Sequence, residues 1–192
     1  MNFEVINVLD MIEAVGEDMA NAVLSEFLCS RNKEIEKFVH KNAIEFAKKK
    51  MSITYLVYNV DGCLAAIFTL AHKALEISGE CLSETVRRKL RRFSQIDETK
   101  DCYNVSAFLI GQFGKNDAYS GENISGIELM DLTFSVLLKV QHDIGGSLVY
   151  LDCEENNKLL DFYTKEPNLF RPFGDNYSEI DNTKYIQLLK FI

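Results

Sequence analysis

The stretch that decides the fold is AFLIGQFGKNDAYSGENISGIELM, residues 107–130. It begins as an apolar run typical of a buried strand, continues as a polar segment with four glycines at 111, 114, 121 and 126, and becomes apolar again at helical spacing. A strand, a Gly-rich turn and a helix N-terminus leave backbone N–H groups without intrahelical partners, which favours a bound anion, above all phosphate. The residues that define a P-loop or a Rossmann fingerprint are missing, and an ordinary surface loop explains the same glycines.

Composition limits the class of protein. The chain has 192 residues, 47% of them hydrophobic, and only 2 prolines, which predicts one globular domain, residues 1–192, with a real core. The N-terminal segment has no basic residue before Arg31, and no apolar run approaches the roughly 18 residues that span a bilayer. The 5 cysteines are scattered without a C-x-x-C pair, against a disulfide framework or a zinc site. We expect a cytoplasmic protein without a bound metal and without a membrane partner.

Charge is unevenly distributed along the chain. The formal net charge is -8, but residues 31–100 are net basic and both ends are net acidic. One basic cluster is Lys48, Lys49 and Lys50, and the other is RRKLRR, residues 87–92. Such clusters can contact nucleic-acid phosphates, although a solvated helix face is the interpretation that the sequence favours.

The pattern of apolar residues predicts an α/β chain. We expect a strand over residues 2–9, helices over 17–29 and 32–50, and two antiparallel strands joined at Asp61-Gly62 by a type I′ turn. A short basic helix capped by Ser83 should follow, then a buried strand before the Gly-rich stretch. After it we expect a long helix ended by Gly145 and Gly146. A buried strand over 147–153, a short helix over 156–165 and a closing strand over 184–192 complete the order.

This order and several local strings resemble the GNAT superfamily of N-acetyltransferases over nearly the whole chain. SAFLIGQF, residues 106–113, resembles the family's fourth strand, and SLVYLDC, residues 147–153, resembles its fifth. EENNKLLDFYTKEPNLFRPF, residues 154–173, is similar to the signature in which a helix carrying Asn and then Phe-Tyr precedes an aromatic-rich strand. The strings TYLVYNVDGCLAAIFTLAHKAL and LIGQFGKN resemble a bacterial branch that includes toxin-like members.

The resemblance implies a mixed, mostly antiparallel sheet flanked by helices, whose fourth and fifth strands splay apart to admit acetyl-CoA. It also implies an acetyl-CoA cofactor whose pyrophosphate is held by residues 114–125. The implied cofactor-binding residues are Leu109, Ile110, Gly111, Gly121, Asn123, Ile124, Ser125, Gly126, Ile127, Asn156 and Tyr163.

The loop departs from the family pattern Q/R-x-x-G-x-G/A. Gly126 matches the fixed glycine, but Asn123 and Glu128 replace the first and last positions. A carboxylate in the first turn of the helix suits the dipole but repels a nearby phosphate. The departure leaves room for weak or lost CoA binding.

The chemistry of acetyl transfer asks little of side chains. An amine must lose a proton, the oxyanion must be stabilised, and the departing thiolate must gain a proton. The resemblance implies Tyr163 as general acid, against a packing role beside Phe162. Glu154 or Glu155, at the end of the fifth strand, is a candidate base, and water is the alternative. His72 can face a substrate or be a surface residue, and nothing near Cys153 in the sequence supports a nucleophilic triad.

Three functions follow from these residues. The first is an N-acetyltransferase that acts on the primary amine of a small molecule, peptide or protein. The second is a toxin-type enzyme that acetylates aminoacyl-tRNA and contacts the tRNA through residues 87–92. The third is a non-catalytic module that binds CoA or a partner. The acceptor, an antitoxin partner and the oligomeric state, a homodimer included, are left open by the sequence.

Overall fold

The computed structural model describes residues 3–118, 124–179 and 182–192. Its strands are joined in the order β1-β2-β3-β5-β6-β8-β7, with β4 paired to β5. The chain forms two compact units, Met1–Ala71 with Ile110–Ser135, and His72–Leu109 with Val136–Ile192. The prediction of a single domain stays a prediction, and each unit is described in turn.

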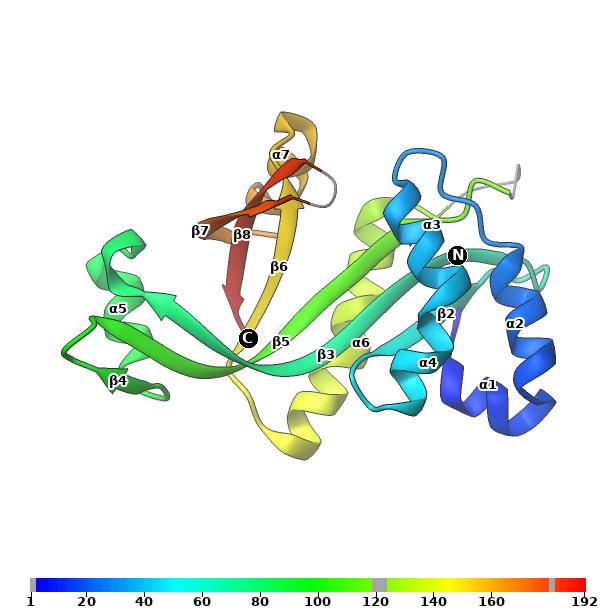
Figure 1. The fold of residues 1–192 in the computed structure, drawn as a ribbon, viewed down its shortest axis with the longest axis horizontal. Coiled ribbons are helices and arrows are strands. Elements are labelled where there is room, and N and C mark those ends of the chain that lie inside the picture. Colours follow the sequence, from blue (N-terminus) through cyan, green and yellow to red (C-terminus); the bar gives the residue numbers. More distant parts are fainter. Residues whose placement is uncertain (1–2, 119–123, 180–181) are drawn as a thin grey trace. The chain divides into compact units, whose positions relative to one another are not determined.

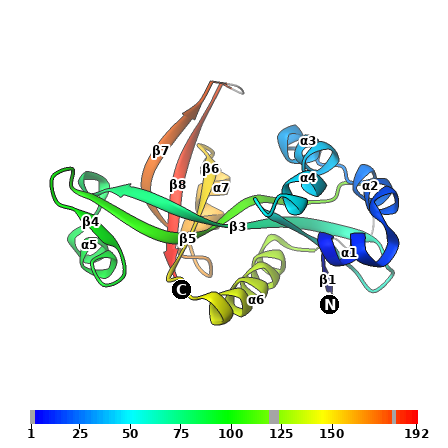
Figure 2. The ribbon, with the colours of Figure 1, turned by 60° about the horizontal axis from the view of Figure 1, so that its bottom comes forward.

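The first unit combines four N-terminal helices with the strands around them (Figure 1). Its elements are β1 (Glu4–Asn7), α1 (Val8–Val15), α2 (Glu17–Ser25), α3 (Lys33–Lys41), α4 (Ala43–Lys48) and β2 (Ile53–Tyr58), with the first half of β3 (Leu64–Ser78), the end of β5 (Cys102–Lys115) and the first half of α6 (Gly126–Ile144). In Figures 1 and 2, α3 and α4 lie on one side of these strands and the start of α6 on the other.

Two sequence predictions for this unit were wrong. The expected strand over residues 2–9 is only Glu4–Asn7, because Asn7 accepts a hydrogen bond from the amide of Leu9 and starts α1. The expected helix over 32–50 is two helices, α3 and α4, that meet at Asn42. As a result, α1, α3 and α4 each contribute buried residues to the unit's core. This core includes Val8, Leu24, Phe27, Leu56 and Ile67.

The β2–β3 hairpin forms as predicted, but its turn is not type I′. The strands pair antiparallel from Ile53↔Leu70 to Tyr58↔Leu64. Among the described loop residues only Gly62 has a positive φ, +74°, whereas type I′ needs a positive φ at both central residues. The side chain of Asn59 instead accepts hydrogen bonds from the amides of Asp61 and Cys63, at 3.0 and 2.9 Å, and stabilises a longer turn.

The second unit contains the rest of β3, β5 and α6 and the C-terminal elements. Its other elements are the 3-10 helix η1 (Gly79–Cys81), α5 (Glu84–Leu90), β4 (Gln95–Asp97), β6 (Leu148–Glu154), α7 (Asn157–Thr164), β7 (Arg171–Ser178) and β8 (Thr183–Phe191). Ile77, Leu90, Tyr103, Leu148 and Leu189 are at the centre of its core. Figure 2 shows β7 and β8 as a long hairpin.

The local signals in this unit were predicted correctly. Ser83 caps α5 by accepting a hydrogen bond from the amide of Val86, and α6 ends before Gly145 and Gly146, both with positive φ. The three residues of β4 were not predicted. Their pairing with Cys102, Tyr103 and Asn104 of β5 is a tertiary contact with little local signal.

The β5–β6 pairing gives the sheet its mixed character. The two strands run parallel through Phe108↔Val149 and Leu109↔Tyr150, while β6 continues to Glu154 in antiparallel register with β8. The other registered pairs, β1–β2, β2–β3, β4–β5 and β7–β8, are antiparallel. The α/β fold with a mostly antiparallel sheet is therefore confirmed.

Candidate functional site

The first unit holds the start of the Gly-rich stretch in place with one buried amide side chain. Asn116, only 5% exposed, accepts hydrogen bonds through Oδ1 from the amides of Leu28 (2.9 Å) and Ala118 (3.0 Å) and donates through Nδ2 to the carbonyl of Leu64 (2.8 Å). It thereby ties the end of β5 to the α2–α3 loop and to the first residue of β3. This positioning residue was missed by sequence reasoning, and an Asn directly after a strand was its only signal.

The N-terminus of α6 is closed by a reciprocal pair of hydrogen bonds. Ser125 Oγ accepts from the amide of Glu128 at 3.1 Å, and Glu128 Oε2 accepts from the amide of Ser125 at 2.9 Å. This is a capping box, in which two orphan amides of the helix start are satisfied by side chains. The amides of Gly126 and Ile127 lie in the first turn, before the first intrahelical bond from Leu129 to Ser125. Gly121 and Asn123, two other predicted loop residues, lie outside the described residues.

Three predicted residues lie in β5, divided between the units. In the second unit Leu109 is half-buried and stands opposite Tyr150 of β6. In the first unit Ile110 is 3% exposed and Gly111 is exposed. The next amide, that of Gln112, donates to Thr69 Oγ1 at 2.7 Å, so a buried side chain takes up a β5 backbone donor in the segment predicted to face the thioester. Ile124, predicted beside the pyrophosphate, is fully buried.

The second unit places Tyr163 on α7 in an apolar environment. Its side chain is 9% exposed, and its ring lies edge to face with Phe162 at 4.9 Å and Phe170 at 6.1 Å. Burial, and secondly the neighbouring Cys153, raise the pKa of Tyr163 well above that of a free phenol, which is about 10. The phenol therefore stays protonated at neutral pH, and the same shift makes it a weaker acid than a free phenol.

Asn156 and the two candidate bases have structural contacts of their own. Asn156 is the N-cap of α7, where its Oδ1 accepts from the amide of Lys158 at 2.9 Å. Glu155 accepts a hydrogen bond from Lys184 Nζ at 3.1 Å, and Lys184 also pairs with Asp175. Glu154 is half-buried at the end of β6, opposite Tyr185. Of the two candidate carboxylates, Glu155 is held by Lys184, and the choice of base stays a prediction.

The histidines and cysteines have ordinary environments. His72 Nε2 lies 2.8 Å from Ser106 Oγ, and its ring packs on Phe108 at 4.9 Å. Burial raises the pKa of the Cys153 thiol to about 11, which keeps it a thiol at neutral pH. Within the described ranges no cluster of His, Cys, Asp or Glu side chains could hold a metal ion, and no helix there could span a membrane.

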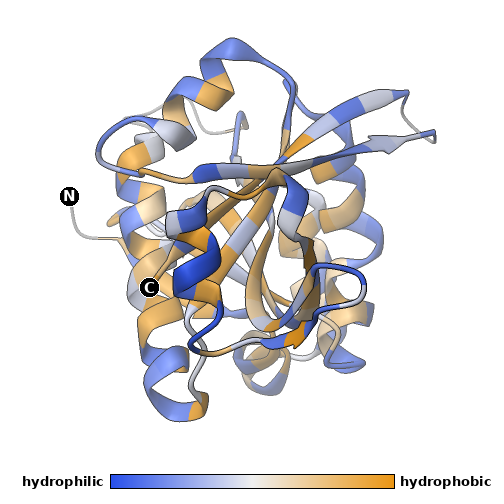
Figure 3. Cartoon of the chain, turned by 90° about the vertical axis from the view of Figure 1, so that its left-hand side faces the viewer, coloured by the Kyte–Doolittle hydropathy of each residue, from blue (hydrophilic) through white to orange (hydrophobic). Residues whose placement is uncertain are grey.

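The basic segment, residues 87–92, begins on α5 and is partly neutralised within its own unit. Arg87 pairs with Asp101 and donates through Nε to the carbonyl of Gly79 at 3.1 Å. The Arg91 guanidinium nitrogen Nη1 lies 3.6 Å from Glu84 Oε1. The Lys89 ammonium group lies over the ring of Phe191. Figure 3, which faces the α5 side, shows the helix alternating between hydrophilic and hydrophobic residues.

Two arginines of this segment are exposed to solvent. Arg88 and Arg92 are exposed, four positions apart, and have no ion-pair partner among the residues that the structure describes. In Figures 1 and 2, α5 and α7 are well separated within the second unit. A ligand that contacts both Arg88 and Tyr163 must therefore be large.

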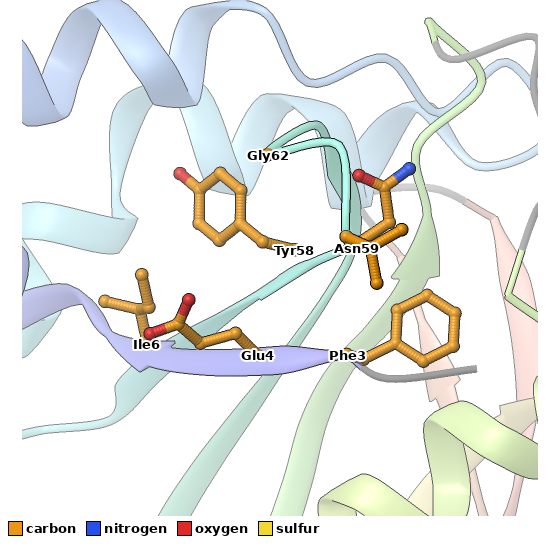
Figure 4. Close-up of a pocket in the computed structure, with 7 residues that line it drawn as sticks. Phe3, Glu4, Ile6, Tyr58, Asn59 and Gly62 are labelled. Carbon is orange, nitrogen blue, oxygen red and sulfur yellow. The ribbon is translucent and has the colours of Figure 1, made fainter.

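One hollow of about 410 Å³ lies in the first unit, at the end of the β1–β2 pair. Its lining residues are Phe3, Glu4, Ile6, Tyr58, Asn59, Val60 and Gly62 (Figure 4). It is shallow and open, and it contains none of the predicted site residues. We assign it no part in the chemistry.

Comparison with known proteins identifies the fold. The sequence matches no protein-family model and no curated protein. Among solved structures, AtaT complexed with acetyl-methionyl-tRNAfMet is 14% identical, with a TM-score of 0.61 over 96% of this chain and 94% of AtaT. A tyrosine-to-phenylalanine mutant of KacT is 13% identical, with a TM-score of 0.65 over 100% of this chain and 95% of KacT.

In a third matching structure, the known protein is bound to a ligand and to a partner protein. It is a mutant AtaT toxin bound to the C-terminus of the antitoxin AtaR and acetyl-CoA, 14% identical, with a TM-score of 0.59 over 100% of this chain and 94% of AtaT. Sequence identities this low show that the folds are alike and nothing more. The chain thus has the GNAT acetyltransferase fold, and it shares that fold with the toxin AtaT and with KacT.

Proposed function

We propose that the protein is an acetyl-CoA-dependent N-acetyltransferase whose acceptor is the amino group of an aminoacyl-tRNA. The observation that carries the proposal is the shared fold, over nearly the full length of both chains, with AtaT complexed with acetyl-methionyl-tRNAfMet. The sequence alone favoured an unspecified amine and held aminoacyl-tRNA as the alternative. The structural neighbours support that alternative better, since AtaT is complexed with an acetylated aminoacyl-tRNA. A second match, which holds acetyl-CoA, supports the acetyl donor.

We propose donor-binding roles for residues of each unit, taken separately. In the first unit, the Gly126 and Ile127 amides at the start of α6 would bind the pyrophosphate, helped by the positive end of the helix dipole. Asn116 would position the loop before them. In the second unit, the backbone of Leu109 would stabilise the oxyanion. Acetyl-CoA, when bound, supplies the acetyl thioester.

Proton transfer is assigned to residues of the second unit. We assign the donated proton to the Tyr163 phenol, which is protonated at neutral pH and would pass this proton to the departing thiolate. Glu154, or water, would accept the proton of the attacking amine. Neither role asks for a metal or a covalent enzyme intermediate.

The acceptor class is supported by two exposed arginines, Arg88 on α5 and Arg92 just after it. A small amine reaching Tyr163 would not contact Arg88 or Arg92, because α5 and α7 are separated within the unit (Figure 1). An RNA is large enough to place its aminoacyl end near α7 and a phosphate near α5. Phosphate contacts of this kind contribute sequence-independent affinity that falls with salt.

Acetylation assays with defined acceptors test the proposal. The purified chain is incubated with radiolabelled acetyl-CoA and with aminoacylated tRNA, deacylated tRNA, free amino acids or a lysine peptide. Label in the aminoacyl moiety of charged tRNA alone is the expected result. Label in free amines but not in charged tRNA would contradict the proposal and indicate a transferase that acts on small amines. No transfer to any acceptor, together with no acetyl-CoA binding by calorimetry, would leave a non-catalytic module.

A further inference from the structure

The carboxylate of Glu128 occupies the helix terminus to which the proposed function assigns the pyrophosphate. Glu128 Oε2 lies 2.9 Å from the amide nitrogen of Ser125, and the amide of Glu128 is held by Ser125 Oγ at 3.1 Å. The hydrogen bond from Ser125 lowers the pKa of Glu128, so this side chain is an anion at neutral pH. The protein has therefore placed its own negative charge at the positive end of α6.

A diphosphate at the same terminus would meet this charge at close range. Phosphates at a helix start bind through the orphan amides and the helix dipole. Glu128 already takes one of these amides, and its charge offsets the favourable potential of the terminus. The two remaining donors, the amides of Gly126 and Ile127, stand next to a carboxylate that is held by the hydrogen bond from the Ser125 amide.

We infer that Glu128 sets the cofactor affinity of this protein: its capping carboxylate competes with the pyrophosphate for the start of α6 and keeps acetyl-CoA binding weak. This inference rests on the proposed function. It predicts that the penalty applies to the diphosphate of the ligand and not to its pantetheine arm. It also predicts that removing the charge strengthens binding, which is the opposite of the usual result of altering a binding-site residue.

The variant Glu128→Gln separates charge from capping. Glutamine also serves at this position of a capping box, so the helix start is preserved while the negative charge is lost. Asp131→Asn is the matched control, because Asp131 is an exposed acid one turn further along α6 and its removal changes the net charge equally. Thermal unfolding of both variants verifies that they are folded.

Calorimetry with two ligands tests the inference. Acetyl-CoA carries the diphosphate, and S-acetylpantetheine carries the same thioester arm without it. For Glu128→Gln we expect acetyl-CoA to bind about five- to tenfold more tightly than to the wild type at low salt, a gain that shrinks as the salt concentration rises. The affinity for S-acetylpantetheine should not change, and Asp131→Asn should alter acetyl-CoA affinity by less than about twofold.

The outcomes that overturn the inference are distinct from failure of the proposed function. Equal acetyl-CoA affinity of the wild type and Glu128→Gln overturns the inference and leaves the function standing. An equal gain with S-acetylpantetheine, or in Asp131→Asn, overturns it as well, because the effect would then be general. If neither the wild type nor Glu128→Gln binds acetyl-CoA, the proposed function falls and takes the inference with it.

Discussion

The ring of Tyr163 meets the ring of Phe170 edge to face, with centroids 6.1 Å apart and planes at 81°. Tyr163→Phe keeps this packing and removes only the hydroxyl. If Tyr163 is the general acid, kcat should fall about 100- to 10,000-fold while acetyl-CoA affinity stays nearly the same. Steady-state kinetics with charged tRNA, combined with calorimetry, measure the two quantities separately.

A second hydroxyl in the same unit provides the control for this variant. Tyr177 is 55% exposed and donates a hydrogen bond to Asn182 in the β7–β8 hairpin. Tyr177→Phe should leave kcat unchanged. Full activity of Tyr163→Phe would make Tyr163 a packing residue, and loss of acetyl-CoA binding would place it in the cofactor pocket instead.

Three arginines of residues 87–92 should divide into one structural residue, Arg87, and two nucleic-acid contacts, Arg88 and Arg92. Arg87→Ala breaks the ion pair with Asp101 and the bond to Gly79, and should lower the free energy of unfolding by about 1 kcal/mol. Arg88→Ala should change it by less than about 0.5 kcal/mol. Urea denaturation measures both. A larger loss for Arg88→Ala than for Arg87→Ala would contradict the assignment.

Charge reversal at the exposed pair should weaken tRNA binding. We expect Arg88→Glu with Arg92→Glu to reduce charged-tRNA affinity about tenfold or more at low salt, and the wild-type affinity to decrease steeply with salt. A filter-binding salt titration gives both results. Lys48→Glu with Lys49→Glu is the matched control, since these lysines pair with Glu17 and Glu45 in the first unit. Wild-type binding that does not depend on salt would argue against phosphate contacts by α5.

The two glycines after α6 should differ in their tolerance of alanine. Both have positive φ, +78° at Gly145 and +116° at Gly146, so alanine is strained at either position. A Cβ at Gly146 would also lie 2.6 Å from the buried ring of Phe108, whereas a Cβ at Gly145 would meet nothing within 4 Å. We expect Gly145→Ala to cost about 1 kcal/mol of unfolding free energy and Gly146→Ala about 2 kcal/mol or more. Equal costs would mean that Phe108 moves aside freely.

Asp117 should make stability fall on acidification. The hydroxyl and amide of Ser30 donate to its carboxylate and lower its pKa in the folded state, while in the unfolded chain the pKa is about 3.9. The unfolded state therefore binds the proton first as pH falls. The contribution is fully present above about pH 5 and is lost as pH falls through the folded pKa. Urea midpoints of the wild type and Asp117→Asn should converge as the pH falls from about 5 through the folded pKa of Asp117. A constant difference would show that charge at Asp117 is irrelevant.

The sequence by itself determined the order of the main elements. Local sequence signals were sufficient for these elements, because they depend on neighbouring residues and not on tertiary contacts. They are the periodic apolar residues of α2, α5 and α6, the cap at Ser83 and the helix end before Gly145. The same holds for the strand, Gly-rich stretch and helix of residues 107–130. The capping box was also available in the sequence, because Ser125 and Glu128 have the required spacing.

The tertiary structure alone decided which polar side chains gain hydrogen-bond or ion-pair partners and which become buried. Arg87 and Arg88 are adjacent and chemically equal in the sequence, but only Arg87 has Asp101 within reach. Asn116 is one polar residue among many in its loop until Leu28 and Leu64, 88 and 52 positions away, are brought to its amide. Tyr163 acquires its raised pKa from burial beside Cys153 and Phe170. Such contacts join residues far apart along the chain or depend on exclusion of water, and neither is set by local conformational preference.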